Sequence, residues 1–463
     1  MFEFKQSNNF LFINFRAIIY ITIFIGLISF LLTFLYKKEV NKQNNLQYLE
    51  DSLSKVKNLN LDSTNNAIFY ENKNSNIVSI NIIFKGGASL DYLSNYNGSS
   101  YLLSQSLLKG AGGLSFEDFN YLLEKYSIKI SIKADRDQII ISFNTLNYYI
   151  KNAFEVLDMI LNSPNLDQRA INLAKNEIFT EINLNQTNLN YKLFKKLREN
   201  LYPYSKFYGD ITGTKKSLNM ITPEMLKNFK NTIITKSNIY IAVSGNISSD
   251  NLFNNFNYII NKLPKGKSKI FNLDYQEPII NNKIVKVPYK SNQSNILLVF
   301  NAPIYNTSDF LYAKIINSYL GNIPDSILFD QLRNKEGLVY SVSSSLYSDY
   351  LSTFWLVSLG SSHQNADLAI SKVKSILLEL KNKKYLLSDV LLAKNWLLTY
   401  NLGNFSSNES IAHYINSLQF RDTNVFSALE KYKSIDKVSQ ANINNLLDNI
   451  DISKVLVIKS VDN

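Results

Sequence analysis

Hydrophobic positions along this chain follow strand-like and helix-like periods, and the same succession of segments occurs twice. The first half is predicted to contain the strands 77–84, 128–132, 138–143 and 239–243, the helices 97–109, 115–126, 150–161 and 249–262, and a long helix from residue 167 onward. The second half repeats this order with strands 295–300, 338–345, 353–359 and 455–460 and helices 308–320 and 366–381. Matching segments lie about 215–220 residues apart, which indicates an internal duplication. The pattern predicts two α+β domains of like fold.

The segment before this duplication has a different pattern. Residues 17–36 form an uncharged run of 20 residues, of which 13 are Ile, Leu or Phe, between Arg16 and the pair Lys37–Lys38. As a helix this run would span about 30 Å, the thickness of a bilayer's hydrocarbon core. It is longer than a signal-peptide core, and no cleavage pattern of small residues follows it. We therefore expect an uncleaved transmembrane helix that exports the globular part.

These patterns give a predicted domain organisation for the whole chain. The expected order is a short flank (1–16), a transmembrane anchor (17–36), a tether (37–65), a first domain (66–262), a linker (263–284) and a second domain (285–463). A chain of 463 residues with 45% hydrophobic content is long and apolar enough to build two cores.

The composition removes several kinds of chemistry. The chain has no cysteine, which excludes disulfides, thiolate nucleophiles and Cys-ligated metal sites. It has only two histidines, His363 and His413. We expect His363 in a solvent-exposed loop and His413 packed or capping on a helix, so histidine-based metal sites and proton relays have almost no candidates.

The net charge of +11 does not by itself indicate nucleic-acid binding. The basic residues are scattered, and the one dense run, between Lys262 and Lys269, is typical of a solvated linker. No motif for stacking or cradling a nucleic acid accompanies it. We therefore expect no nucleic-acid partner.

Several spaced motifs in both halves point to one family. In the first half, Phe84, Gly87, Asp91 and the pair Lys109-Gly110 precede the stretch SFEDFNYLLEKYSIKISI. The segment NIYIAVSGNIS ends that half, and LRNKEGLVYSV lies in the second half. In this order the chain resembles the pitrilysin/insulinase metallopeptidases, the inverzincins that include the mitochondrial processing peptidases. The resemblance covers roughly residues 66 to 463 and implies two homologous α/β-roll domains, each an antiparallel-rich sheet packed with helices.

The chain departs from this family at the zinc motif. The register set by Lys109-Gly110 places Tyr101, Ser104 and Gln105 where the family has the residues of HxxEH. Histidines at i and i+4 on a helix both reach one Zn²⁺, and the intervening glutamate takes a proton from the metal-bound water. Tyrosine, serine and glutamine supply neither the ligands nor the base. We expect no catalytic residues and no metal in this chain.

The family's remaining zinc ligand, a glutamate, corresponds to Glu181 in this sequence. One carboxylate does not make a zinc site, which needs several protein ligands. We interpret Glu181 as a vestigial ligand position, a polar helix residue that is hydrogen-bonded to Tyr101 or Gln105.

The second-half signature retains two residues that the family uses. Arg333 and Tyr340 match the pair that holds substrate and transition-state oxygens near the zinc. A guanidinium donates a fork of hydrogen bonds to a carbonyl, and a phenol donates to an oxyanion. Without the resemblance, Arg333 would be an ordinary surface residue and Tyr340 a strand aromatic packed in the core.

The resemblance implies a division of labour between two chains. In bacterial members made of two different chains, one carries HxxEH and zinc, and the other carries the Arg/Tyr pair. We hypothesise that this chain is the inactive subunit of such a heterodimer, anchored by residues 17–36 in a bacterial inner membrane, with its globular part in the periplasm. Its partners would be an HxxEH-bearing subunit and peptides or unfolded proteins. The alternative is an assembly scaffold of a membrane complex without a role in proteolysis; autonomous peptidase activity by another mechanism has no residues to support it.

Overall fold

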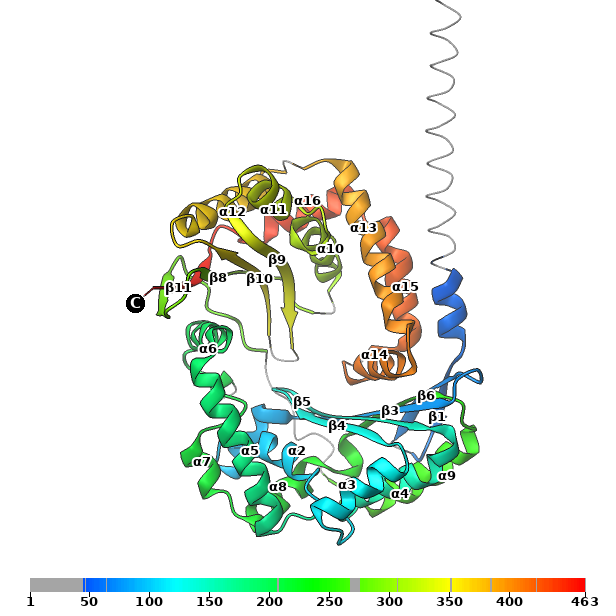
Figure 1. The fold of residues 1–463 in the computed structure, drawn as a ribbon. Coiled ribbons are helices and arrows are strands. Elements are labelled where there is room, and N and C mark those ends of the chain that lie inside the picture. The colour runs from blue at the N-terminus through cyan, green and yellow to red at the C-terminus, as the bar shows by residue number, and fades with distance from the viewer. Residues whose placement is uncertain are drawn as a thin grey trace, which may run out of the picture. The chain divides into compact units, whose positions relative to one another are not determined.

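The computed structural model describes residues 45, 47–63, 65–205, 208–266, 275–305, 307–349, 352–383, 385–421 and 423–462. The chain divides into two compact units, Met1–Asp51 and Ser52–Asn463. All the elements described below lie in the second unit, and most of its helices and strands are labelled in Figure 1.

The first half of the second unit contains a six-stranded mixed sheet in the order β1-β2-β6-β3-β5-β4. Its strands are β1 (Val56–Asn60), β2 (Asn66–Glu71), β3 (Ile77–Lys85), β4 (Lys129–Ala134), β5 (Gln138–Leu146) and β6 (Ile239–Gly245). All pairs are antiparallel except β2 with β6. The strand β4 therefore lies at one edge of the first sheet.

The second half contains a five-stranded sheet in the order β7-β11-β8-β10-β9. Its strands are β7 (Ile284–Pro288), β8 (Ser294–Phe300), β9 (Val339–Ser348), β10 (Thr353–Ser361) and β11 (Leu456–Val461). Only β7 and β11 run parallel. Apart from β1, the two sheets have the same strand order and directions. The fold is therefore two α/β domains of one topology, as the duplicated pattern predicts.

The helices follow the predicted order in both halves. In the first they are α2 (Ser99–Ser106), α3 (Phe116–Lys125), α4 (Ile150–Asn162), α5 (Gln168–Thr187), α6 (Leu189–Leu201), α7 (Lys215–Met220), α8 (Pro223–Ile233) and α9 (Ser249–Lys262). In the second they are α10 (Ser308–Asn317), α11 (Ile327–Phe329), α12 (Ala366–Lys381), α13 (Leu387–Leu402), α14 (Asn408–Phe420), α15 (Val425–Lys437) and α16 (Gln440–Asn449). The second half also contains two short π-helical turns, η5 (Ser318–Asn322) and η6 (Asp330–Lys335).

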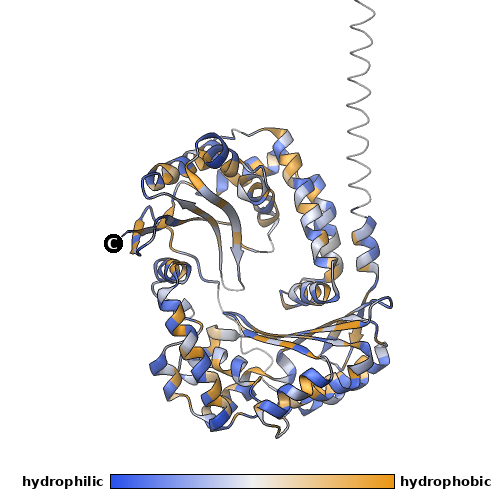
Figure 2. Ribbon diagram, in the orientation of Figure 1, coloured by the Kyte–Doolittle hydropathy of each residue, from blue (hydrophilic) through white to orange (hydrophobic). Residues whose placement is uncertain are grey.

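One face of each sheet supplies the core of its domain. In β3 the alternate residues Val78, Ile80, Ile82 and Phe84 are buried with the apolar faces of the surrounding helices. Figure 2 shows hydrophobic and hydrophilic residues interspersed along these helices, as expected for elements with one buried face. Side-chain caps such as Ser115 and Asp167, which accept hydrogen bonds from the amides three residues on, fix where α3 and α5 begin.

Two helices contact the sheet of the other half. The helix α6 belongs to the first half but packs against β7, β8 and β11 of the second sheet. The helix α14 belongs to the second half but packs against β2, β3, β5 and β6 of the first sheet. The helices α6 and α14 occupy equivalent places in the two halves. Each domain therefore packs one equivalent helix against the sheet of the other domain.

The segment predicted as a tether contains structure that the sequence did not indicate. Residues 56–60 form β1, which pairs antiparallel with β2 at the edge of the first sheet. Val56 is buried, and the polar residues that follow it are mostly exposed. An edge strand needs few apolar residues, because only one of its sides pairs with a neighbour.

Within the described ranges, no helix is long and apolar enough to cross a membrane. The predicted anchor at residues 17–36 lies outside the described residues.

Candidate functional site

The helix that corresponds to the zinc-motif position is α2, and Asp91 holds its first turn. The Asp91 carboxylate accepts hydrogen bonds from the backbone N–H groups of Gly98 (2.6 Å) and Ser100 (2.8 Å). Burial raises the pKa of Asp91 to about 6, and these hydrogen bonds oppose the rise. Gly98 has φ of 92°, and a Cβ there would lie 2.8 Å from the carbonyl oxygen of Thr212. The start of α2 is therefore fixed by a buried acid and by a glycine that no other residue replaces without strain.

On α2, Tyr101 reaches the glutamate expected as a vestigial ligand. The Tyr101 hydroxyl donates a hydrogen bond of 2.6 Å to Oε2 of Glu181 on α5. Burial, and then the charge of Glu181, raise the pKa of the phenol well above its ordinary value. Of the two partners expected for Glu181, the structure shows Tyr101. The carboxylate is thus already engaged by a neutral donor.

Ser104 and Gln105 do not rebuild the missing chemistry. The Ser104 hydroxyl is fully buried and donates to the carbonyl oxygen of Tyr101 within the same helix (2.7 Å). The Gln105 amide lies 3.5 Å from that hydroxyl. A serine hydroxyl bonded to a backbone carbonyl has no base to activate it.

The second acid on α5 is neutralised as well. Lys109, which is only 8% exposed, places its ammonium 2.6 Å from Oε1 of Glu177. The same ammonium lies 4.9 Å from the centre of the Phe116 ring. Glu177 and Glu181, the two carboxylates of α5, are therefore both paired with side chains of this chain.

These residues do not fit the zinc ion that the family implies. Among the described residues, no cluster of three or more His, Asp or Glu side chains is placed to hold a metal. The Tyr101 hydroxyl of α2 instead donates a hydrogen bond to the Glu181 carboxylate of α5. No hydrolytic step can be assigned to it.

The second-half pair lies on the surface. Arg333 is exposed in η6, with its guanidinium 5.1 Å from the centre of the Phe329 ring. Tyr340 is 59% exposed near the start of β9, so the alternative of a core-packed strand aromatic is wrong. Neither side chain forms an ion pair with another described residue, and the structure shows no hydrogen bond between them. Their guanidinium and phenol groups are open to a ligand.

Both histidines differ from the sequence expectation. His363 is half-buried and not free in solvent: Nδ1 lies 2.8 Å from the Ser294 hydroxyl and Nε2 lies 2.6 Å from the carbonyl oxygen of Ser291. The loop folds back onto the start of β8, which the polar sequence of the loop does not reveal. His413 lies on α14 as expected, but its side chain is exposed and not packed. Although the side chain is exposed, desolvation by the neighbouring protein lowers the pKa of His413; the negative charge of Glu409 opposes this shift and the positive charge of Lys133 adds to it.

Comparison with known families covers both halves of the chain. Residues 67–215 match the model described as insulinase (peptidase family M16), and residues 220–395 match the peptidase M16 inactive domain. The chain belongs to the M16 insulinase family. The resemblance seen in the sequence is thereby confirmed, for a member in which HxxEH is replaced.

Curated M16 relatives are distant and include one without peptidase activity. The chain is 27% identical over 281 residues to the non-peptidase homolog YmxG of Helicobacter pylori, covering 59% of this chain and 63% of that protein. It is 21% identical over 182 residues to the probable mitochondrial-processing peptidase subunit beta of Arabidopsis thaliana, covering 39% of this chain and 34% of that one. The matches thus span less than two thirds of these two relatives.

Solved structures share the fold over nearly the whole second unit. A peptidase M16 inactive domain from Pseudomonas fluorescens superposes with a TM-score of 0.80 at 17% identity, covering 88% of this chain and 98% of that chain. A protease from Helicobacter pylori superposes with a TM-score of 0.79 at 13% identity, covering 88% and 99%. At such identities the likeness describes the M16 fold alone.

Proposed function

We propose that this M16 chain is the non-catalytic subunit of a two-chain zinc peptidase. A second subunit with an intact HxxEH would supply the metal and the hydrolysis of peptides or unfolded proteins. This chain would supply part of the substrate-binding wall, including Arg333 and Tyr340. The proposal accounts for a first domain that lacks the zinc-binding motif and a second domain that retains Arg333 and Tyr340.

The exposure of Arg333 and Tyr340 carries this proposal. The exposure of Arg333 also agrees with an ordinary surface residue, so Tyr340 carries the greater weight: a strand tyrosine without a binding role would pack in the core, and Tyr340 does not. A guanidinium and a phenol in solvent are suited to donate hydrogen bonds to carbonyl oxygens of a bound chain. Because this chain lacks a zinc site of its own, those donors are useful only beside a metal from a partner.

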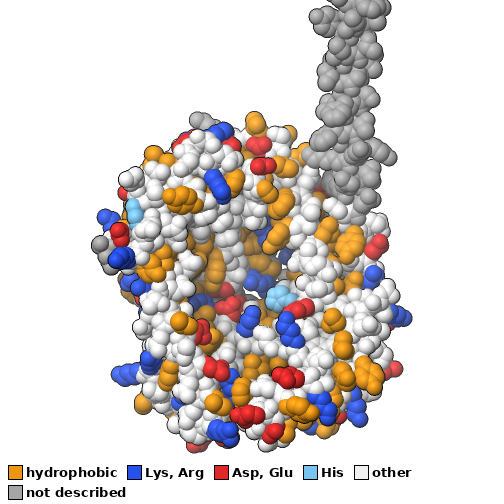
Figure 3. Space-filling model, in the orientation of Figure 1, with side chains coloured by type: hydrophobic (Ala, Val, Ile, Leu, Met, Phe, Trp, Pro, Cys, Tyr) orange, Lys and Arg blue, Asp and Glu red, His pale blue; other side chains and the backbone are white. Residues whose placement is uncertain are grey.

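The first sheet offers a second supporting feature. Its edge strand β4 contacts α2, so an unpaired strand edge lies beside the degenerate motif helix. An extended peptide can add to such an edge through backbone hydrogen bonds that demand no particular sequence. In the face shown in Figure 3, charged side chains of both signs surround a hollow, a surface suited to a polar backbone.

The membrane location is part of the same proposal. It rests on the uncharged run at residues 17–36 and on the basic residues at both of its ends. We propose that this run anchors the subunit in a bacterial inner membrane and that the globular part faces the periplasm. A protease-protection assay on spheroplasts tests this, since an exported domain is digested only from outside.

Co-purification tests the pairing. The full-length chain is isolated from its native membranes, and the associated proteins are identified and assayed on unfolded peptides with and without this chain. The expected result is a stable complex with an HxxEH-bearing M16 protein and cleavage only by the pair. Recovery of this chain in a complex without any such protein would favour the scaffold alternative.

Variants of the exposed pair test the assigned role. Arg333→Ala should leave the complex assembled but lower kcat/KM about tenfold or more, because a charge-assisted hydrogen bond to substrate is lost. Arg169→Ala, at an exposed arginine of α5, is the matched control and should leave the rate unchanged. Tyr340→Phe is compared in the same way with Tyr121→Phe, whose tyrosine is 67% exposed on α3. Equal rates for all four variants would remove the pair from the mechanism.

A further inference from the structure

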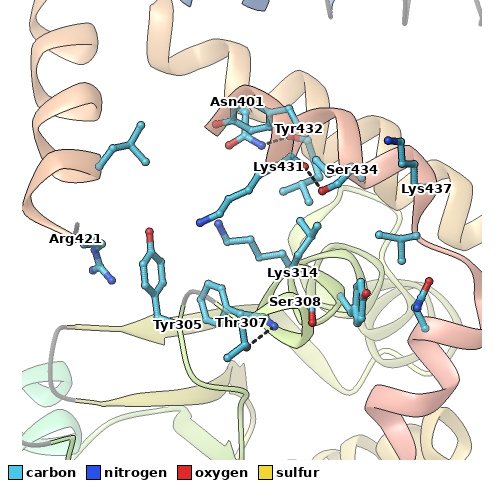
Figure 4. Close-up of a pocket in the computed structure, with 18 of the residues that line it drawn as sticks. Tyr305, Thr307, Ser308, Lys314, Asn401, Arg421, Lys431, Tyr432, Ser434 and Lys437 are labelled. Carbon is cyan, nitrogen blue, oxygen red and sulfur yellow. Dashed lines mark hydrogen bonds between the residues drawn. The ribbon is translucent and has the colours of Figure 1, made fainter. Parts of the chain in front are cut away.

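The second domain contains a cavity that the proposed function does not use. Its volume is about 570 Å³, a size suited to a small organic ligand. It is lined from the loop after β8, from α10, α13, α14 and α15, and from the start of α16. Figure 4 shows the side chains that surround it.

One part of this cavity is basic. Lys314 on α10 and Lys431 on α15 point from different helices toward the same space, and Arg421 lies nearby at the end of α14 (Figure 4). The described residues that line the cavity include no aspartate or glutamate. Lys314 forms no ion pair with the described residues, and its ammonium lies 5.4 Å from the centre of the Phe310 ring.

The protein tolerates an electrostatic cost at Lys314. Although Lys314 is exposed, desolvation by the surrounding protein, and then the positive charges of Lys431 and Arg421, lower its pKa to about 8. The positive charges of Lys431 and Arg421 disfavour the charged form of Lys314, and a neutral side chain at this position would remove that repulsion. An anionic group bound beside Lys314 would oppose the same repulsion.

Arg421 shows how the cationic end is held in place. Its guanidinium donates to the hydroxyl (3.1 Å) and the carbonyl oxygen (2.8 Å) of Ser348 and lies 4.3 Å from the centre of the Tyr305 ring. These contacts fix the guanidinium at the wall of the cavity before any ligand binds. A positioned cation loses little side-chain entropy when it binds an anion.

The remaining wall is apolar and aromatic. It includes Tyr305, Phe310, Leu397, Leu418, Ile435 and Val438. Tyr414 and Tyr432 hydrogen-bond to each other through their hydroxyls, so their rings add a rigid surface. A cavity that combines a cationic end with such a wall is suited to a ligand with both properties.

We propose that this cavity binds a small amphipathic anion, that is, one phosphate or carboxylate group attached to an apolar body. The anionic group would lie among Lys314, Lys431 and Arg421, and the apolar body would lie against Tyr305 and the leucines of α13 and α14. The site is separate from Arg333 and Tyr340, which do not line it.

Calorimetry on the purified full-length chain in a non-ionic detergent tests the site. The probes are 1-naphthyl phosphate and 1-naphthoate, which carry the two candidate groups, with neutral 1-naphthalenemethanol and inorganic phosphate as comparisons. We expect saturable binding of at least one naphthyl anion with one site per chain, and at least tenfold weaker binding of the alcohol and of inorganic phosphate. The tighter of the two anions identifies the preferred group.

A variant assigns the binding to this cavity. Lys314→Met keeps the apolar stem and should weaken binding of the naphthyl anion about tenfold or more, because a charge-assisted contact is lost. Lys227→Met, at an exposed lysine of α8, is the matched control and should bind as the unmodified chain does. The ligand-free Lys314→Met protein should melt at the same or a higher temperature, since a repelled charge is removed.

Three results would overturn the proposal. These are no saturable binding of either naphthyl anion, equal affinity for the neutral alcohol, and unchanged affinity in Lys314→Met. Each outcome is independent of peptide cleavage, so failure here leaves the proposed subunit function untouched.

Discussion

The helices α6 and α14 are equivalent elements of a duplicated fold, yet they contact the opposite sheets through different chemistry. Leu193, Leu197 and Leu201 of α6 pack into an apolar cluster with residues of the second sheet. The residues of that sheet in the cluster are Val287, Leu297, Val299, Phe354, Leu356, Leu456 and Ile458. This contact is stabilised by buried area and does not depend on direction.

The α14 contact is directional instead. The side-chain amide of Asn416 donates to the carbonyl oxygen (2.9 Å) and side-chain oxygen (2.8 Å) of Asn81 and to the carbonyl oxygen of Tyr240 (3.2 Å). At the start of α14, Asn408 donates to the carbonyl oxygen of Ile77 (2.7 Å) and accepts from the Ser244 hydroxyl (3.0 Å). The face of the first sheet that meets α14 carries serine and asparagine where the second sheet carries valine and leucine.

The difference has a physical lesson for duplicated folds. The same topology is compatible with an apolar contact, which tolerates small shifts, and with a polar one, which fixes the position of the helix. An apolar contact loses stability in proportion to the volume removed, whereas a polar one loses it when a buried partner is left unpaired. The two contacts should therefore respond differently to substitution and to pH.

The largest effect is expected at the apolar contact. Leu197→Ala removes a side chain that is 1% exposed and should lower the free energy of unfolding by about 2–5 kcal/mol. Leu184→Ala, at a leucine that is 65% exposed on α5, is the matched control and should change it by less than about 0.5 kcal/mol. Urea unfolding followed by circular dichroism measures both. Equal midpoints for the two variants would contradict the assignment of α6 to a buried cluster.

An intermediate effect is expected at the polar contact. Asn416→Leu leaves the acceptors on Asn81 and Tyr240 without this donor and should cost about 1–3 kcal/mol. Asn228→Leu, on the exposed side of α8, is the control and should be nearly neutral. A double-mutant cycle with Asn81→Ala should show a coupling of about 1 kcal/mol. Strict additivity would show that the Asn81–Asn416 hydrogen bond contributes nothing.

The smallest effect is expected in the pH dependence of stability. It arises from His413 on α14 and involves no change to a buried contact of either helix. Because the surroundings of His413 on α14 lower its pKa, the unfolded chain binds a proton more readily than the folded chain. Stability should therefore be highest above the ordinary histidine range and decrease as pH falls through it. His413→Gln should reduce this decrease between pH 7.5 and 5.5, measured by thermal unfolding. A steeper loss of stability with falling pH in His413→Gln would contradict the lowered pKa of His413.

The sequence predicts the fold well where a local pattern determines the structure. The helix at 366–381 and the strand beginning at 77 follow from apolar period and β-rich composition, and the structure places them within a residue or two of the prediction. The pattern does not predict that α6 and α14 pack on the opposite sheets, because an amphipathic face does not specify its partner. Nor does it reveal the π-helical turn at Ser318–Asn322, which interrupts the predicted helix 308–320.

The candidate sites divide in the same way. The contact between Tyr101 and Glu181 follows from a motif register and a spacing, so the sequence predicts it as one of two choices. The cavity around Lys314 is assembled from side chains between residues 305 and 442 that share no motif. Only the packing of α10, α13 and α15 brings those side chains together. No pattern in the sequence therefore predicts this cavity.

The hydrogen bond between Tyr101 and Glu181 has a consequence for how this chain folds. In a zinc protein the liganding carboxylate and imidazoles are satisfied only when the ion arrives, so the metal contributes to folding. In this chain the Tyr101 phenol, not a metal ion, is the partner of the Glu181 carboxylate. We therefore expect the domain to fold without added metal, and chelators should leave its melting temperature unchanged. In the proposed two-chain complex, the folding of only the HxxEH-bearing chain would then depend on zinc.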